Sequence, residues 1–166
     1  MLIIFIISQR KNIPSIKKSV EALAELCGRA IDTPYERVYT FSTPQELCCA
    51  SDEELAKCTL GYRLPYIKDA ISRVVSGELN LDTLAQLDNE ALMAALQSVK
   101  GVGEKVGNCV MLFAYGRTFR VPVDTWIKKI IAEKFNGENQ FLQYGENAGV
   151  MQQYAFYYIL QHKSEV

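Results

Sequence analysis

Two glycines one residue apart, followed closely by a lysine, are the feature of this sequence best suited to chemistry. Gly101-Val102-Gly103 separates two helix-like stretches, and Lys105 follows the second glycine by two residues. Such a turn lets the backbone approach a ligand closely. The next helix begins with unpaired N–H groups and a positive dipole end, which together bind a phosphate. An ordinary glycine-rich turn would look the same, so the downstream sequence has to decide.

A carboxylate follows at a spacing that suits the same site. Asp124 lies 19 residues beyond Lys105, within Val121-Pro122-Val123-Asp124-Thr125-Trp126. The pattern predicts a strand-like bend leading into a helix from Trp126 to Phe135, which places Asp124 at the N-cap. For one carboxylate, capping a helix and taking part in a reaction are compatible roles.

Composition excludes several other classes of function. The chain has 166 residues and a formal net charge of −1, which excludes a histone-like basic wrapper but not a protein that binds nucleic acid with one face. His162 is the only histidine, which excludes catalysis by histidine pairs or triads. The five cysteines, at 27, 48, 49, 58 and 109, contain no zinc-type pair and no C-terminal cluster loop, and their odd number favours a reducing cytoplasm. The apolar run from Met1 to Ile7 is too short for a membrane span.

The spacing of apolar residues predicts an all-α protein of about ten short helices. Cap residues delimit several of them. Helices are expected at Pro14–Cys27 with Gly28 as C-cap, from Thr43-Pro44, from Ser51, and at Leu64–Val75, Asp82–Gln86 and Asp88–Ser98. The stretch from Tyr35 to Phe41 is expected to be irregular, and Met1–Ile7 to be buried.

Taken in order, these motifs resemble the helix-hairpin-helix (HhH-GPD) DNA glycosylase superfamily, and within it most closely the 8-oxoguanine DNA glycosylase/AP lyase family. The hairpin with Lys105 and the segment ending at Asp124 are the specific matches. Weaker ones are Ile6-Ile7-Ser8-Gln9, Leu60-Gly61-Tyr62-Arg63, and Gly149 with Gln152 and Phe156. The resemblance implies two helical subdomains flanking a catalytic cleft, which we expect at residues 1–115, with the hairpin at about 92–115, and at 116–166. We expect a cytoplasmic monomer whose partner is double-stranded DNA containing a damaged base or an abasic site.

By this resemblance, Lys105 is the Schiff-base lysine, and Asp124 is the carboxylate that stabilises the oxocarbenium-like sugar as the glycosidic bond breaks. The lysine must be neutral to attack the sugar C1′, and burial and the positive helix end both favour the neutral amine. Glu104 should then face solvent. Monofunctional relatives lack this lysine, so Lys105 implies the bifunctional type, which excises the base and then cleaves the abasic site by β-elimination. The resemblance to the 8-oxoguanine family implies base excision repair of that lesion.

The resemblance also assigns the base pocket and the contacts with DNA. A flipped base has to be held between flat or soft surfaces. Cys109 and Phe156 would sandwich it, and Gln152 would hydrogen-bond its edge. The residues expected at the DNA are Gly101, Val102, Gly103, Lys100, Tyr62, Arg63 and Asn12. The carbonyls of Gln97, Val99 and Val102 are candidates for holding Na⁺ or K⁺, and no other cofactor is expected, including an iron–sulfur cluster.

Departures from the family keep alternatives open. We expect its N-terminal β domain to be absent, and that domain carries the carbonyl that distinguishes 8-oxoguanine from guanine. Trp126 stands where vertebrate-type relatives have histidine, which indicates a bacterial-type branch. Arg10 and Lys11 differ from the family's asparagine-rich segment, in which Asn12 lies. The alternatives are a truncated, non-catalytic helix-hairpin-helix module that binds DNA, and a glycosylase for another damaged base.

Overall fold

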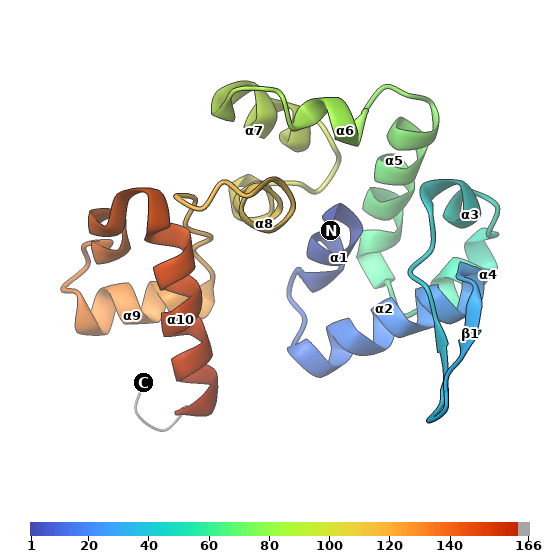
Figure 1. The fold of residues 1–166 in the computed structure, drawn as a ribbon, viewed down its shortest axis with the longest axis horizontal. Coiled ribbons are helices and arrows are strands. Elements are labelled where there is room, and N and C mark those ends of the chain that lie inside the picture. Colours follow the sequence, from blue (N-terminus) through green and yellow to red (C-terminus); the bar gives the residue numbers. More distant parts are fainter. Residues whose placement is uncertain (163–166) are drawn as a thin grey trace. The chain divides into compact units, whose positions relative to one another are not determined.

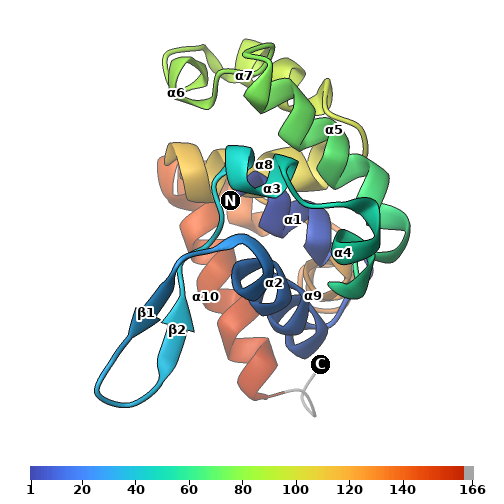
Figure 2. The same cartoon turned by 90° about the vertical axis from the view of Figure 1, so that its right-hand side faces the viewer.

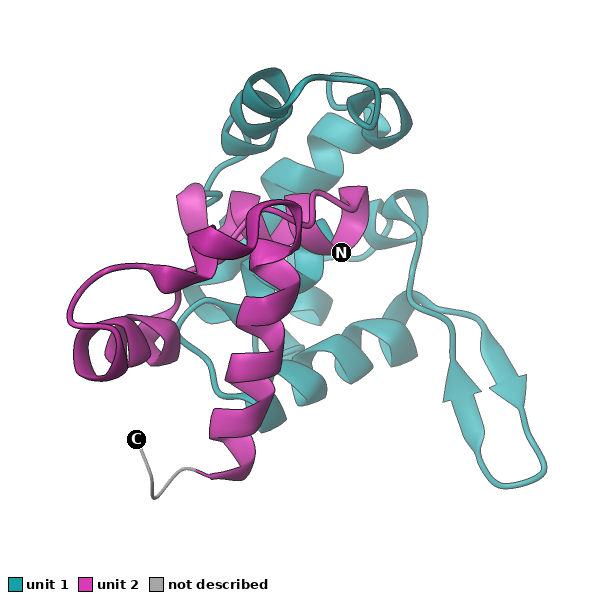
Figure 3. Ribbon diagram, turned by 60° about the vertical axis from the view of Figure 1, so that its left-hand side comes forward, with its two compact units in different colours: residues 1–102 teal, residues 103–166 magenta. Residues whose placement is uncertain are grey.

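The computed structural model describes residues 1–162 and divides the chain into two compact units, Met1–Val102 and a second unit that begins at Gly103 (Figures 1 and 3). The described part contains ten α-helices, two 3-10 helices and one two-stranded sheet. The predicted all-α class is therefore confirmed. Among residues 1–162, no helix has both the length and the apolar character that crossing a membrane requires.

The first unit is built around the short N-terminal helix α1 (Leu2–Ser8), which packs against α2 and α5. Leu2, Ile6 and Ile7 are buried, which confirms the predicted burial of Met1–Ile7 for these residues, whereas Ile3, Ile4 and Phe5 are half-buried and Met1 is exposed. The other helical elements of this unit are α2 (Ile13–Cys27), α3 (Pro44–Cys48), α4 (Asp52–Lys57), the 3-10 turn η1 (Gly61–Arg63), α5 (Leu64–Val75), α6 (Leu81–Leu84) and α7 (Asn89–Gln97).

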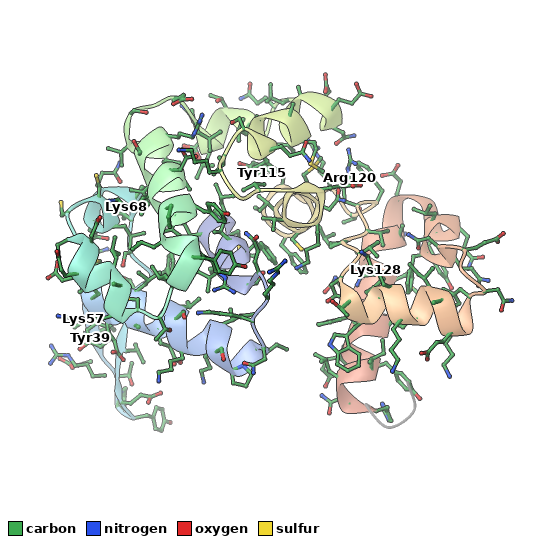
Figure 4. All side chains as sticks on the ribbon, turned by 180° about the vertical axis from the view of Figure 1, so that it is seen from behind. Tyr39, Lys57, Lys68, Tyr115, Arg120 and Lys128 are labelled. Atoms are coloured by element: carbon green, nitrogen blue, oxygen red, sulfur yellow. The ribbon has the colours of Figure 1, made fainter. Side chains whose placement is uncertain are left out.

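Local capping sets where these helices begin. Thr43 and Ser51 each form a reciprocal capping box with the glutamate three residues later, Glu46 and Glu54. Asp88 accepts hydrogen bonds from two N–H groups in the first turn of α7. Across the unit, an ion pair of 2.5 Å between Lys68 and Asp52 joins α5 to α4; Lys68 is labelled in Figure 4. These caps confirm the predicted helix starts. The starts could be predicted because each capping bond joins residues that lie within four positions of each other in the sequence.

A β-hairpin interrupts the helices where the sequence predicts irregular chain. Strands β1 (Ala30–Asp32) and β2 (Arg37–Tyr39) pair antiparallel, with Ala30 opposite Tyr39, and they form the separate ribbon that is visible in Figure 2. All six strand residues are exposed. Strands of three residues without a buried face carry no apolar alternation, which is why the pattern missed them.

The second unit consists of α8 (Glu104–Tyr115), α9 (Thr125–Lys134), the 3-10 segment η2 (Gln140–Asn147) and α10 (Ala148–Gln161). Every residue of α8 from Val106 to Leu112 is buried, which makes α8 the most enclosed helix of this unit. A second apolar cluster contains Val121, Ile127, Ile130, Phe141, Ala148 and Ile159.

The observed division between the units differs from the expected boundary after residue 115. It falls between Val102 and Gly103, so α8 groups with the C-terminal segment. The Arg117 N–H donates to the Met111 carbonyl at 2.9 Å, a local bond that ends α8 at Gly116, whose φ is +64°. The grouping itself rests on contacts within each unit, whereas the sequence pattern shows only that α7 and α8 are joined by a tight turn.

Candidate active site and DNA interface

The turn between α7 and α8 requires glycine at its first glycine position. Gly101 has a φ of +79°, and a Cβ there would lie 2.3 Å from Cδ2 of Tyr66. The Val102 N–H donates to the Val99 carbonyl at 3.1 Å, and both valines are buried. The close contact with Tyr66 and the burial of Val99 and Val102 therefore hold the turn in place.

The second glycine, Gly103, is not required by backbone conformation. It is the N-cap of α8 with φ −91° and ψ −177°, which is ordinary extended backbone, and no side chain caps the helix there. A Cβ at Gly103 would meet no atom within 4 Å. The first bond of α8 runs from the Gly107 N–H to the Gly103 carbonyl at 2.9 Å, so the earlier N–H groups have no partner within the helix. The missing side chain thus keeps open space in front of a helix terminus that attracts anions.

Lys105, Cys109 and Asp124 lie close together within the second unit. Burial raises the pKa of the Cys109 thiol, the nearby Asp124 carboxylate raises it further, and the Lys105 ammonium, which hydrogen-bonds to the sulfur, lowers it. Lys105 and Cys109 are one turn apart on α8 and share a face. Glu104 is exposed, as predicted. The structure thus brings Lys105 and the Asp124 carboxylate, which are separated in sequence, to one buried thiol.

Asp124 is held in place by its own helix. Its backbone is extended, and its Oδ1 accepts a hydrogen bond from the Ile127 N–H at 2.9 Å, which confirms the predicted N-cap of α9. The Lys128 N–H then donates to the Asp124 carbonyl at 2.9 Å and starts the helix; Lys128 is labelled in Figure 4. One carboxylate oxygen is used by the cap, so the other can serve a ligand.

The predicted pocket residues of α10 belong to the same unit as Lys105. Gln152 is buried, with its Oε1 accepting from Gln153 Nε2 at 2.6 Å, and Phe156 is partly buried against the apolar cluster. The Gly149 N–H donates to the Thr118 carbonyl at 2.8 Å, and a Cβ at Gly149 would lie 2.0 Å from the Arg120 carbonyl oxygen. Glycine thus lets α10 sit directly on the backbone that leads to Asp124. A sandwich of a base between Cys109 and Phe156 stays a prediction.

The residues of the first unit expected at the DNA differ in exposure. Tyr62 is exposed, whereas Arg63 is only 5% exposed and its guanidinium donates to the Gln9 and Leu60 carbonyls. Asn12 caps α2 by accepting from the Ser15 N–H at 2.9 Å. Arg63 and Asn12 therefore have structural roles, and their contact with DNA stays a prediction.

Lys100 is exposed, and its backbone N–H donates to Asp69 Oδ2 at 2.9 Å. One contact at the turn joins residues that are distant in the sequence. The Gln9 side-chain amide donates to the Gly101 carbonyl at 3.0 Å, across 92 residues of sequence. No spacing signal could have revealed a contact over that separation.

Within residues 1–162, no group of three or more His, Cys, Asp or Glu side chains is placed to hold a metal ion. The Val99 carbonyl, one of three expected at a monovalent cation, already accepts the Val102 N–H, which leaves it one lone pair. A cation at this turn stays a prediction.

The chain is similar to known proteins over most of its length. The model of the HhH-GPD superfamily of base excision DNA repair proteins matches residues 3–141. A "Probable N-glycosylase/DNA lyase" of Methanothermobacter thermautotrophicus is 29% identical, over 84% of this chain and 53% of that protein. The "N-glycosylase/DNA lyase OGG1" of Arabidopsis thaliana is 31% identical, over 78% of this chain and 36% of that protein.

Solved structures of proteins of the same kind also match this chain. MBOgg1 in complex with a low-affinity DNA ligand matches with a TM-score of 0.92 and 37% identity, and the 8-oxoguanine glycosylase/lyase of Clostridium acetobutylicum, in complex with double-stranded DNA, with 0.88 and 32%. Both matches cover 98% of this chain and 59% of the other chain. This chain thus spans about half the length of the curated relatives and somewhat more of the solved ones. With the family model matching well over half of its residues, the chain belongs to the HhH-GPD superfamily of base excision DNA repair proteins.

Proposed function

We propose that this chain is a bifunctional DNA glycosylase and AP lyase that excises 8-oxoguanine from double-stranded DNA. The observation that carries the proposal is the cluster of Lys105 and Asp124 around the buried Cys109 thiol. The relatives support it, since those from M. thermautotrophicus and A. thaliana are named N-glycosylase/DNA lyase. The C. acetobutylicum protein was solved with cytosine opposite 8-oxoguanine, which favours the same lesion here.

In the proposed reaction, the neutral amine of Lys105 attacks the sugar C1′ while the bond from C1′ to the base breaks. The base leaves with the electron pair of that bond, and the free oxygen of Asp124 stabilises the positive charge that develops on the sugar. Nζ then loses a proton, the C1′–O4′ bond breaks with its electron pair going to O4′, and O4′ takes a proton, which opens the sugar ring and leaves a protonated Schiff base between Nζ and C1′. Removal of a proton from C2′ expels the 3′ phosphate by β-elimination and nicks the strand.

DNA binding would rest on the backbone of the hairpin. The open N-terminus of α8 at Gly103 can receive a phosphate through its N–H groups, without reading the base sequence. A Na⁺ or K⁺ held by the carbonyls of Gln97, Val99 and Val102 would add positive charge beside that phosphate. A net charge of −1 is compatible with this mode, because the donors are backbone groups.

Borohydride trapping on a duplex that contains an abasic site tests the proposal. The reagent reduces the Schiff base to a stable amine, so the wild-type chain should form a covalent adduct. Lys105→Gln should form none and should still bind the duplex. Lys57→Gln is the matched control, because Lys57 is exposed at the end of α4 (Figure 4) and should leave the adduct unchanged. An adduct of equal yield in Lys105→Gln would overturn the proposal.

A non-catalytic DNA-binding module is the second candidate. It is favoured by one observation, that the open N-terminus of α8 at Gly103 can receive a phosphate without any part played by Lys105 or Asp124. The same experiment distinguishes the two candidates, because a module would bind the duplex without forming an adduct.

A further inference from the structure

The Asp69 carboxylate of α5 holds the backbone at the start of the hairpin turn. Its Oδ2 accepts hydrogen bonds from the Lys100 backbone N–H at 2.9 Å, across 31 residues of sequence, and from Arg73 Nε at 3.0 Å. Its Oδ1 lies 3.9 Å from Lys100 Nζ. Only 14% of the Asp69 side chain is exposed. Both carboxylate oxygens are thus committed to the turn or to the arginine beside it.

One face of α5 carries all the residues that make or support this contact. Tyr66, Asp69 and Arg73 are three and four residues apart, a spacing that places side chains on the same side of a helix. Tyr66 covers Gly101 so closely that a Cβ there would lie 2.3 Å from Cδ2 of the ring. Arg73 bonds to Asp69 and is also paired with Glu78. The turn is therefore held by one side of one helix.

The charges around Asp69 favour its ionised form. Burial raises the pKa of this carboxyl group, but the hydrogen bonds from the Lys100 N–H and from Arg73, together with the positive charges of both side chains, outweigh burial and hold the pKa below its usual value. Hydrogen bonds to an ionised acceptor are stronger than those between neutral groups. Since Arg73 is paired with the carboxylate, a negative group can lie beside a turn that is to meet a phosphate.

The turn contains one unpaired backbone donor whose neighbours on both sides are fixed. The Lys100 N–H donates to the carboxylate and the Val102 N–H to the Val99 carbonyl. The N–H between them, that of Gly101, has no hydrogen-bond partner within residues 1–162. The Gly101 carbonyl in turn accepts from the Gln9 amide at 3.0 Å. A donor that is ordered before its ligand arrives loses less freedom on binding.

We infer that Asp69 is a positioning residue of the DNA-binding turn, which orients the Lys100 peptide and with it the Gly101 N–H for a phosphate of the duplex. This inference rests on the proposed function, because the ligand is the same DNA. Asp69 acts through the backbone of the turn and touches neither the base nor the sugar. Its substitution should therefore weaken binding and leave the chemical step unchanged.

Fluorescence anisotropy on duplex DNA, together with the rate of borohydride-trapped adduct at saturating duplex, separates binding from chemistry. Asp69→Ala should lower affinity about tenfold, equally for damaged and undamaged duplex, because it removes a hydrogen bond to a charged group. The adduct rate at saturation should be unchanged. Asp69→Asn keeps an oxygen that can accept the Lys100 N–H, so it should recover most of the affinity. If Asp69 mattered only as a negative charge near DNA, both variants would bind more tightly, which would overturn the inference.

Ser51→Ala is the matched control for stability. It removes the N-cap of α4, within the same unit as Asp69, and should lower the melting temperature. Because the cap has no contact with the turn, Ser51→Ala should bind duplex as the wild type does when measured well below its melting temperature. An equal loss of affinity in Ser51→Ala and Asp69→Ala would show that Asp69 acts only through stability.

Lys100→Pro tests the contact itself, because proline has no backbone N–H. In this background, adding Asp69→Ala should cost no further affinity. In Lys100→Ala, which loses only the side chain, the same addition should still cost about tenfold. An equal loss in both backgrounds would overturn the inference, because Asp69 would then act through another group.

Hydrogen exchange of the Lys100 amide, followed by NMR, measures the same contact without a proline substitution. Exchange should be much faster in Asp69→Ala than in Ser51→Ala, and equal rates would overturn the inference.

Failure of the proposed function gives a different result. If the wild-type chain neither binds duplex nor forms the Lys105 adduct, the proposed function fails first. If it does both and Asp69→Ala binds duplex as tightly as the wild type, this inference alone is overturned.

Discussion

The two glycines of the hairpin should respond to substitution in opposite ways. Gly101→Ala forces a side chain into the left-handed region, which costs about 1–2 kcal/mol, and places its Cβ 2.3 Å from the Tyr66 ring. We expect a total destabilisation of about 2 kcal/mol or more, which corresponds to a melting temperature lower by about 4–8 °C for a chain of this size. Gly103→Val keeps an ordinary extended backbone, and the poorer N-cap should cost no more than about 1 kcal/mol.

DNA binding should show the reverse order. The Gly103→Val side chain would fill the open space before the N-terminus of α8 and block a phosphate there. Hydrogen bonds to charged groups contribute about 1.5–3 kcal/mol, so affinity should fall about 10- to 100-fold. The loss should be equal for damaged and undamaged duplex, because the hairpin contacts only the backbone.

Thermal melts and fluorescence anisotropy on matched duplexes measure both quantities. Refutation would take one of two forms. If Gly103→Val has a melting temperature as low as that of Gly101→Ala, then Gly103 is required for stability and the reasoning is wrong. If its affinity falls only for lesion-containing DNA, the turn belongs to the base pocket and not to the backbone interface.

Four other predictions concern the residues of the candidate site. Asp124→Asn should melt like the wild type, because an amide oxygen can still accept the Ile127 N–H, while excision slows by about 10²–10³; wild-type turnover would remove Asp124 from the mechanism. Cys109 should react with iodoacetamide far more slowly than the exposed Cys48, because burial raises the pKa of its thiol and shields it, and mass spectrometry showing equal labelling rates would contradict this. Because folding raises the pKa of the Cys109 thiol, the contribution of this thiol to the free energy of unfolding is fully present below about pH 8.5 and is lost as the pH rises through its pKa in the folded chain. The free energy of unfolding from urea denaturation should therefore fall less between neutral and alkaline pH in Cys109→Ala than in the wild type. Finally, cleavage of a ready-made abasic site, which needs Lys105 and Asp124, should be faster than excision of 8-oxoguanine, and lesion-selective excision at the lyase rate would refute this.

The sequence by itself determined the features that depend on near neighbours. The helix starts at Thr43, Ser51 and Asp88 follow from hydrogen bonds between residues no more than three apart in sequence. The types of these residues therefore predict the starts. The role of Asp124 as a cap is local in the same way. Lys105 could be identified from the sequence because it lies two residues after the second glycine of the turn.

Only the tertiary structure decided what each of these residues contacts. Lys105 and Asp124 meet at Cys109 within the second unit, which no spacing rule shows. Arg63 was expected at the DNA, yet its guanidinium is buried on the Gln9 carbonyl, 54 residues away in sequence. The residue type predicts that a buried guanidinium will be paired, because an unpaired buried charge is too costly. It does not predict which group will be the partner. The burial of Arg63 is therefore an outcome of packing, since burial depends on which distant segments come together.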